Sequence, residues 1–462
     1  MRYISTRGGV QPVDFAQAVM MGLATDGGLL LPERIPEIPI ATWQRWATLS
    51  FQELALEVMA PFVGDAIPAA DLRDLVQRSY ATFTHPEITP VVQVGSRYIL
   101  ELFHGPTLAF KDVALQFLGN LFATLLARQG GRLNILGATS GDTGSAAIHG
   151  VRGKERIHIF ILHPHGRVSP VQERQMTTVL DANVHNIAVQ GDFDDGQRIV
   201  KALFNDLDFK NTYQLGAVNS INWARILAQV VYYVYAWGRV TEGDTGHAVT
   251  FSVPTGNFGD IFAGFVARRM GLPIHRLLLA TNRNDILTRF VATGVYETGQ
   301  VAPTVSPSMD IQVSSNFERY LYYLFDANAK RVRDCMEQLS RTGRFQVTAD
   351  EQAAAAREFP AMAVSEAATL QQIRDTDAQH RYLLDPHTAV GVHAARDEKG
   401  SVICLATAHP AKFADAVRQA TGRDPELPPV FAGLLAMPTR CAVLPADVEA
   451  VRRFIQETRG VL

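Results

Sequence analysis

The chain has 462 residues, of which 47% are hydrophobic and 19% are charged, a composition that excludes a disordered protein and predicts two or three folded domains. Its formal net charge is −3 and it has no long run of lysine or arginine, which argues against nucleic acid or an acidic membrane as a partner. We therefore expect the partner to be a small molecule.

The sequence contains no segment that predicts membrane insertion, secretion or metal binding. Its most apolar long stretch, Ile226 to Trp237, has twelve residues, whereas a membrane-spanning helix needs about 20. The N-terminus lacks the apolar core of a signal peptide, so we expect a cytoplasmic protein. Cys335, Cys404 and Cys441 are too few and too far apart for a disulfide framework, and the spacing of the cysteines and histidines predicts no metal site.

The predicted elements fall into three consecutive regions. Residues 1–92 show helical patterns, as at Asp14 to Met21 and at Phe51 to Val63, and predict a mostly helical N-terminal domain. Short apolar strands then alternate with helices, which is typical of parallel sheets covered by helices, in a first α/β region at 93–240 and a second at 241–462. We expect more than one such sheet. The predicted strands are Leu133 to Leu136, His158 to Leu162, Asn186 to Val189, Ala248 to Val253, Arg276 to Leu279 and Val402 to Ala406.

One lysine stands in the first turns of a predicted buried helix. Thr107 is the expected N-cap, and the residues from there to about Arg128 place apolar side chains on two adjoining stripes that include Lys111. Burial withholds water from the ammonium and the positive end of the helix dipole repels it, so both effects should lower the pKa of Lys111. A partly neutral lysine can attack a carbonyl, as a Schiff base with an aldehyde cofactor requires. The alternative is a lysine whose ammonium reaches the surface.

Three loops at predicted strand ends favour ligand binding, because ligands gather at the carboxyl ends of strands in open α/β sheets. Residues 137–145, Gly-Ala-Thr-Ser-Gly-Asp-Thr-Gly-Ser, offer glycines, hydroxyls and amides to a phosphate or carboxylate, with a plain tight turn as the alternative. In residues 254–260, the amides from Gly256 through Asp260 can form a nest for a dianionic phosphate. Thr407 follows a third strand, where a neutral hydroxyl can face a ring nitrogen and leave it unprotonated.

These features together resemble the threonine synthases, pyridoxal-phosphate enzymes of the tryptophan-synthase-β fold group. The resemblance covers nearly the whole chain and implies a fold type II α/β catalytic body of two domains plus the N-terminal domain. It is carried by six segments, namely Tyr3 to Gly8, Gly22 to Leu29, Leu102 to Asp112, Val218 to Ile226, Ser306 to Ile311 and Ser314 to Arg319.

The resemblance also implies a set of site residues. Pyridoxal 5'-phosphate would be the cofactor, held by Lys111 as a Schiff base, and Lys111 would also be the catalytic residue. Where related enzymes have an asparagine that contacts the cofactor ring hydroxyl, this chain has Asp142. The alternative for Arg225, if it does not bind the substrate, is an arginine on the exposed surface of a helix. The other implied contacts are Gly256, Asn257, Phe258, Gly259 and Asp260 with the cofactor phosphate, Thr407 with the pyridine nitrogen, and Ser140 and Thr143 with the substrate carboxylate. Candidates for binding the phosphorylated arm of the substrate are Ser220, Asn222, Arg225 and Ser314.

The reaction implied by the resemblance converts O-phospho-L-homoserine and water into L-threonine and phosphate, the last step of threonine biosynthesis. It is a carbon–oxygen lyase reaction that combines γ-elimination with β-addition of water, and Lys111 would act as base and acid in turn next to the substrate Cα. We expect a monomer or homodimer with no nucleic-acid or membrane partner. The alternatives are another pyridoxal-phosphate lyase such as a serine or threonine dehydratase, a non-enzymatic metabolite sensor, and an ATP-dependent kinase, for which no Walker-type loop is present.

Overall fold

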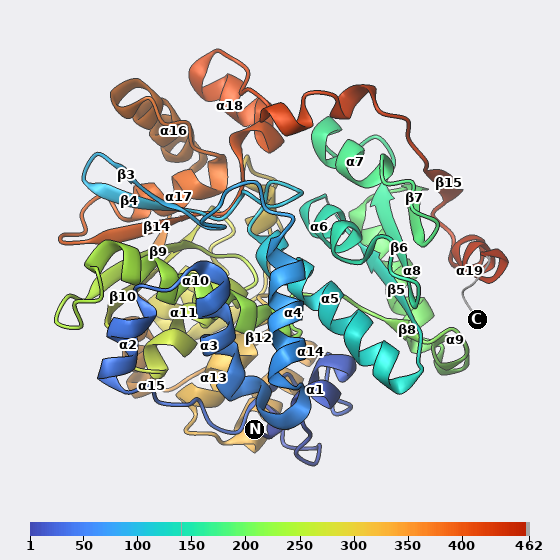
Figure 1. Ribbon diagram of the computed structural model, residues 1–462, viewed down its shortest axis with the longest axis horizontal. Helices are drawn as coiled ribbons and strands as arrows, with labels where there is room; N and C mark the ends of the chain where they lie inside the picture. Colours follow the sequence, from blue (N-terminus) through green and yellow to red (C-terminus); the bar gives the residue numbers. More distant parts are fainter. Residues whose placement is uncertain (140, 459–462) are drawn as a thin grey trace. The chain divides into compact units, whose positions relative to one another are not determined.

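The computed structural model describes residues 1–139 and 141–458, and the chain forms two compact units (Figure 1). Unit 1 comprises Met1–His104 and Ser220–Pro425, and unit 2 comprises Gly105–Asn219 and Glu426–Leu462. Each unit is therefore built from two separate stretches of the sequence. The three consecutive regions expected at 1–92, 93–240 and 241–462 follow the order of the sequence, whereas the two units are defined by spatial contacts. The division into three regions stays a prediction.

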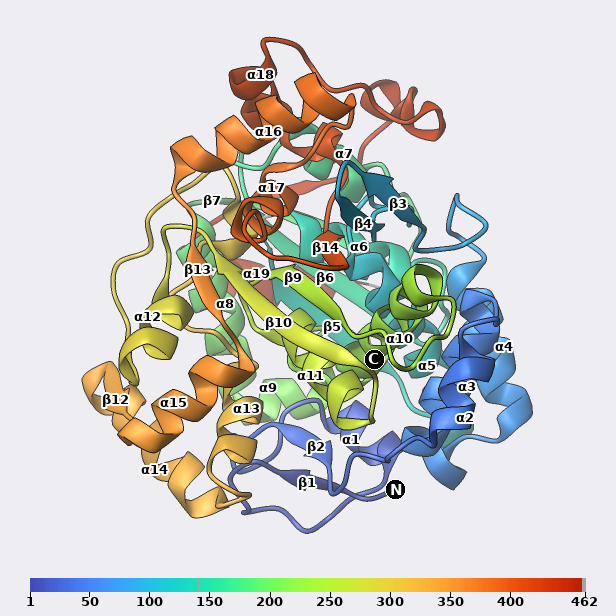
Figure 2. The ribbon, with the colours of Figure 1, turned by 90° about the vertical axis from the view of Figure 1, so that its left-hand side faces the viewer.

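Unit 1 is built on a six-stranded sheet with the strand order β13-β10-β9-β14-β4-β3 (Figure 2). Neighbouring strands are parallel except β3, which pairs antiparallel with β4. Every residue of the central strand β9 is buried, and α11 and α17 both pack against it, which explains why the strand carries no charged residue. Two further two-stranded antiparallel sheets, β1-β2 and β11-β12, complete the unit.

The strands of unit 1 are β1 (Tyr3–Ser5), β2 (Leu30–Pro32), β3 (Val91–Val94), β4 (Arg97–Glu101), β9 (Val249–Pro254), β10 (Ile274–Thr281), β11 (Val295–Glu297), β12 (Arg344–Gln346), β13 (Ala361–Ala363) and β14 (Val402–Ala406). Its helices are α1 (Phe15–Met21), α2 (Ile40–Trp46), α3 (Phe51–Val63), α4 (Ala69–Tyr80), α10 (Trp223–Thr241), α11 (Gly259–Arg269), α12 (Ile286–Thr293), α13 (Phe317–Leu324), α14 (Ala329–Thr342), α15 (Ala349–Glu358), α16 (Glu366–His380), α17 (Pro386–Ala394) and α18 (Ala414–Thr421).

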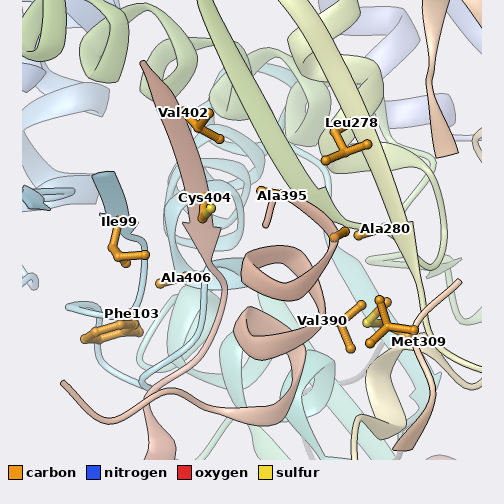
Figure 3. Close-up of a cluster of buried hydrophobic side chains, with 12 residues drawn as sticks. Ile99, Phe103, Leu278, Ala280, Met309, Val390, Ala395, Val402, Cys404 and Ala406 are labelled. Atoms are coloured by element: carbon orange, nitrogen blue, oxygen red, sulfur yellow. The ribbon is translucent and has the colours of Figure 1, made fainter. Parts of the chain in front are cut away.

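A cluster of buried hydrophobic side chains packs on one face of the sheet of unit 1 (Figure 3). Val402, Cys404 and Ala406 alternate along β14 and so point to the same face, where they meet Leu278 of β10 and Val390 of α17. Burying each valine or leucine side chain contributes roughly 1.5–3 kcal/mol to folding. Because β9 and β14 are parallel neighbours, the loops that follow them begin at the same edge of the sheet.

Both helical patterns predicted in the N-terminal region form helices: α3 has the predicted bounds, and α1 begins at Phe15, one residue after the predicted start. Asp14 caps α1 and Ser50 caps α3, each through a capping box with the residue three positions later. Tyr3 donates its hydroxyl to the carbonyl oxygen of Phe62 at 2.8 Å and packs against Trp223 at the start of α10. The first strand is therefore anchored to α3 and to the long helix α10.

Unit 2 contains a five-stranded, wholly parallel sheet with the order β15-β7-β6-β5-β8. The C-terminal strand β15 (red in Figure 1) pairs with β7 (green). The prediction of more than one parallel sheet is confirmed, as is each of the six predicted strands. Its strands are β5 (Leu133–Ala138), β6 (Ile157–Pro164), β7 (Val184–Gln190), β8 (Leu215–Gly216) and β15 (Ala442–Pro445), and its helices are α5 (Lys111–Gln129), α6 (Asp142–Val151), α7 (Pro170–Thr177), α8 (Phe193–Asn205), α9 (Leu207–Thr212) and α19 (Val448–Glu457).

Helix α5 is buried on nearly all sides, as its two apolar stripes predict. It packs closely on α6, and the two helix backbones meet at Gly119 and Gly150. Among the described helices of both units, none is both long and apolar enough to cross a membrane.

Candidate functional site

Lys111 is the first residue of α5, so the helix begins three residues later than the sequence predicts. Leu108 has a positive φ of 61°, which interrupts a helix at this point. Thr107 does not cap the helix as predicted. Its amide and its hydroxyl both donate to the carboxylate of Asp112, at 2.8 and 2.7 Å. A side chain at Gly105 would overlap Asp112, so the whole turn before Lys111 is held in one conformation.

The side chain of Lys111 is mostly buried, as predicted for the motif, and does not extend freely into solvent as the surface alternative requires. Its side chain is 11% exposed, and Nζ lies 4.9 Å from the ring centroid of Phe110. Nζ also donates to Oδ2 of Asp142 at 3.2 Å. A carboxylate at this distance favours the ammonium, whereas burial and the helix end favour the neutral amine. Lys111 is therefore held between opposing influences, one of which comes from Asp142.

The loop before α6 orients Asp142, the first residue of that helix. The hydroxyl oxygen of Thr139 accepts from the amides of Gly141 at 3.0 Å and Gly144 at 2.9 Å, which closes the loop on itself. Thr143 lies in the first turn of α6, and its contact with a substrate carboxylate stays a prediction. Ser140, predicted to bind the same carboxylate, lies outside the described residues.

The loop from Gly256 to Gly259 in unit 1 leads into α11. Two of its backbone carbonyls accept hydrogen bonds from residues that follow later in the chain. The carbonyl oxygen of Gly256 accepts from the Ser314 hydroxyl at 2.8 Å, and that of Asn257 accepts from the amide of Asn316 at 3.0 Å. Within the described residues, the amides of Gly256 to Gly259 donate to no acceptor. Consecutive unpaired amides at a helix N-terminus suit a phosphate, so this loop fits the phosphate of a cofactor.

Phe258 gives this loop its shape. Its φ is 63°, a left-handed conformation that costs a non-glycine residue on the order of 1 kcal/mol. The ring is buried and packs edge-on against Phe317 and Phe359, with centroids 5.2 Å away in each case. Aromatic pairs of this kind contribute about 0.5–1.5 kcal/mol each, enough to offset the strain. A Cβ added at Gly256 would lie 3.0 Å from the carbonyl oxygen of Ser308, so a side chain there would require this backbone to shift.

The carboxylate of Asp260 ties α11 to α10. It accepts from the hydroxyls of Tyr232 at 2.5 Å and Tyr233 at 3.0 Å. Burial raises the pKa of both tyrosines well above its usual value, so both remain hydroxyl donors. The contact between Asp260 and a cofactor phosphate stays a prediction.

Thr407 directly follows β14 and is buried. Its hydroxyl has no hydrogen-bond partner in the described part of the chain, so it can serve a ligand. Burial lowers the pKa of the neighbouring His409 to about 4, so that ring is neutral near pH 7. A neutral hydroxyl donor at Thr407 suits an unprotonated ring nitrogen.

The side chains of Ser220, Asn222 and Ser314 already take part in hydrogen bonds within unit 1. Asn222 caps α10 by accepting from the Ala224 amide, and it donates to the carbonyl oxygen of Val19 at 2.9 Å. The hydroxyl of Ser220 lies 2.9 Å from that of Ser315, and Ser314 holds the carbonyl of Gly256. Their contact with a substrate phosphate stays a prediction.

Arg225 differs from these three. The side chain is buried in the first turn of α10, so its interpretation as a surface arginine is wrong. Burial lowers the pKa of its guanidinium to about 10. Its Nη1 has no hydrogen-bond partner among the residues described. A buried cation without an anion is unfavourable, so Arg225 is suited to bind one.

Comparison with known proteins decides what these features belong to. Residues 85–405 match the profile of the pyridoxal-phosphate dependent enzymes, residues 2–80 that of the threonine synthase N terminus, and residues 388–455 that of the threonine synthase C-terminal part. The threonine synthase of Pseudomonas aeruginosa is 48% identical to this chain, over 99% of the chain and 98% of that protein. The chain belongs to the threonine synthase family.

Solved structures agree with this assignment to the threonine synthases. The crystal structure of PLP-bound threonine synthase from Brucella melitensis has a TM-score of 0.96 and 47% identity, and it covers 99% of this chain and 100% of that chain. Threonine synthase from yeast has a TM-score of 0.95 and 45% identity, with 100% and 99% covered. The predicted fold, an α/β body of fold type II with a mostly helical N-terminal part, is confirmed, as is pyridoxal phosphate as the cofactor of the family.

Within each unit, some residues that support the candidate site residues are not predicted by the sequence. In unit 2, Gln172 donates its amide to Oδ1 of Asp142 at 2.8 Å. In unit 1, Asn316 and the fully buried Arg319 support the loop at Asn257. Arg319 lies in a segment that carries the family resemblance, but no local pattern indicates what it contacts. Gln172 gives no sequence signal at all.

Proposed function

We propose that this protein is a threonine synthase, a pyridoxal-phosphate-dependent carbon–oxygen lyase that converts O-phospho-L-homoserine and water into L-threonine and phosphate. The observation that carries the proposal is the mostly buried side chain of Lys111, whose amine lies beside Asp142, in a chain whose full-length relatives are threonine synthases. We also propose that it acts in the cytoplasm, as a monomer or homodimer, on this small-molecule substrate alone.

Lys111 has two roles in this proposal. Its Nζ would hold pyridoxal 5'-phosphate covalently, and during turnover it would take the proton from the substrate Cα and later return it. When bound, the cofactor supplies an electron sink for the negative charge left on that carbon. The partner of Lys111 in this proton transfer is Asp142, which stabilises the ammonium form each time Nζ carries the extra proton.

The loops at the strand ends orient the cofactor and substrate. The amides of Gly256 to Gly259 would bind the cofactor phosphate, and the hydroxyl of Thr407 would donate to the ring nitrogen. Arg225 is our first candidate for the substrate phosphate because its buried guanidinium has an unpaired nitrogen. The remaining proposed contacts are Asn257, Phe258, Asp260 and Asp142 with the cofactor, Ser140 and Thr143 with the substrate carboxylate, and Ser220, Asn222 and Ser314 with the substrate phosphate.

The test is an absorbance spectrum of the purified protein, followed by measurement of phosphate release from O-phospho-L-homoserine and of threonine as the product. We expect a cofactor absorbance band and equal amounts of threonine and phosphate. Lys111→Ala should lose both the band and the turnover, and a variant that makes threonine at the normal rate would refute the proposal. A coloured protein that ignores O-phospho-L-homoserine but deaminates serine or threonine would instead be a dehydratase.

A further inference from the structure

Gln172 on α7 is joined to the residue that contacts Lys111. The side chain of Gln172 is buried, and its Nε2 donates to Oδ1 of Asp142 at 2.8 Å. Its Oε1 accepts from the hydroxyl of Ser169, the N-cap of α7, at 3.0 Å. The opposite orientation of the amide would place its oxygen against a carboxylate oxygen, so the network fixes Nε2 as the donor toward Asp142.

The loop before α6 is built to admit this amide. Gly141 has a φ of 142°, which favours glycine, and a Cβ at this position would lie 2.5 Å from Cδ of Gln172. No residue with a side chain fits there while Gln172 holds its position. The contact between Gln172 and Asp142 therefore depends on the backbone of the loop as well as on α7.

The two carboxylate oxygens of Asp142 accept from different donors. Lys111 donates to Oδ2 at 3.2 Å and Gln172 donates to Oδ1 at 2.8 Å. Hydrogen bonds to the charged form of a carboxyl group favour that form, and a proton on either oxygen would displace one of these donors. Both contacts therefore favour the ionised state of Asp142 and fix its direction.

We propose that Gln172 is a positioning residue that keeps Asp142 ionised and directed at Lys111. This inference rests on the proposed function, because its consequence concerns the nitrogen by which Lys111 holds the cofactor. An anion beside that nitrogen stabilises its protonated, reactive form. Among the described residues, the Gln172 side chain forms hydrogen bonds with Ser169 and Asp142, so it acts on Lys111 through Asp142.

The other titratable groups on the elements packed around Asp142 have neighbours of their own. Helix α6 packs against α5, α7 and β6. On α5, Asp112 accepts from Thr107, and Arg128 lies in the last turn, away from Lys111. On α6 and α7, the ring of His149 lies against the carbonyl oxygen of Gln175, and Arg174 donates to the carbonyl oxygen of Met437. On β6, His158 pairs with His185, and His163 has Glu173 and Cys441 as neighbours.

The experiment compares Gln172→Met with Gln175→Met. Gln175 lies one turn further along the same helix and donates to the carbonyl oxygen of Thr107, not to Asp142. In the cofactor-loaded enzymes, the pH midpoint of the cofactor absorbance should fall by about one unit in Gln172→Met and stay within a few tenths of the wild type in Gln175→Met. Equal shifts in the two variants, or no shift in either, would overturn the proposal.

A second measurement does not require the cofactor. Apo protein is treated with an amine-acylating reagent across a pH series, and labelling of Lys111 is followed by peptide mass spectrometry. An ionised Asp142 holds Lys111 as an unreactive ammonium, so Gln172→Met should be labelled at lower pH than wild type and Gln175→Met should not. Identical labelling of all three proteins would refute the role of Gln172 even if the proposed activity holds, and loss of activity alone would leave this result intact.

Discussion

Asn316 donates two hydrogen bonds to the carbonyl oxygen of Asn257, one from its backbone amide at 3.0 Å and one from its side-chain amide at 3.1 Å. The side-chain oxygen of Asn316 in turn accepts from the guanidinium of Arg319, which fixes which way the amide points. The carbonyl of Asn257 is therefore turned away, and the amides of the loop are left for an anion. Two buried side chains thus shape the proposed phosphate site, which neither of them needs to contact.

Arg319→Met should lower the affinity for the cofactor by at least about tenfold. The guanidinium also donates to the carbonyl oxygens of Leu30 and Ile221, so each of its hydrogen-bond acceptors is an uncharged oxygen. Removing it leaves buried acceptors unpaired, each at a cost of about 1–3 kcal/mol. Titration of apo protein with pyridoxal phosphate, followed by absorbance, measures the effect. Arg319→Lys should recover only part of it, because an ammonium cannot replace the planar fork.

The matched control for this prediction is Arg239→Met. Arg239 lies near the other end of α10 and likewise donates to two backbone carbonyls, those of Ala47 and Leu49. Its loss should reduce stability without weakening cofactor binding. If both variants lose cofactor affinity to the same extent, Arg319 is a general structural residue and not a support of the loop.

Arg225→Met should raise the KM for the phosphorylated substrate by about 10–100-fold, the equivalent of one charge-assisted hydrogen bond. The reason is that its buried guanidinium has a nitrogen without a partner in the described structure. Steady-state kinetics and inhibition by inorganic phosphate measure the effect, and Arg225→Lys should be intermediate. An unchanged KM together with unchanged phosphate inhibition would remove Arg225 from the substrate site.

The sequence predicts what is local and misses what is joined over long distances. The mainly apolar run at Leu133 to Leu136 stands out because a parallel strand covered on both faces is rich in apolar residues. The partners of Arg319 do not, because Leu30 lies 289 residues away in the sequence. Strand β15 is also missed, since it owes its place to pairing with the distant strand β7.

The same limit applies within the candidate site. Lys111 and the loop at Gly256 are predicted because glycine, threonine and lysine patterns carry the chemistry in a few consecutive positions. The N-cap predicted at Thr107 is wrong because Asp112, five residues later, captures its hydroxyl. Gln172 contacts Asp142 from 30 residues away, and no propensity reports such a contact.

The protein should lose stability as the pH falls from about 6.5 to about 4, partly through His185. Burial lowers the pKa of His185 to about 4, and His158 lies 3.0 Å away from it, ring stacked on ring. The unfolded histidine titrates near 6.5, so between these values the unfolded chain binds a proton that the folded chain excludes. Stability gained from the neutral ring is complete above pH 6.5 and is lost on acidification, by on the order of 2 kcal/mol.

Urea unfolding of the wild type at pH 7.5 and pH 5 measures this loss. His185→Phe keeps a flat ring against Phe160 and removes the proton, so its unfolding midpoint should differ less between the two pH values. The exposed His165 supplies the control, since His165→Gln should leave the pH dependence as in the wild type. A dependence that His185→Phe does not reduce would assign the acid sensitivity to other groups.

Gly119→Ala should destabilise the protein and also weaken cofactor binding. In an ordinary helix this substitution stabilises by roughly 1 kcal/mol, because glycine is a poor helix former. Here an added Cβ would overlap the carbonyl group of Gly150 on α6, and backbone atoms cannot turn aside as a flexible side chain can. Overpacking of this kind costs about 1–3 kcal/mol or more, so the clash outweighs the gain in propensity. Because α5 begins with Lys111 and α6 with Asp142, forcing these helices apart also separates that pair.

Thermal unfolding and cofactor titration measure the two effects. Gly433→Ala, in the same unit and with no atom within 4 Å of the added Cβ, should change neither. A stable Gly119→Ala variant with normal cofactor affinity would show that the two helices can part without disturbing the site.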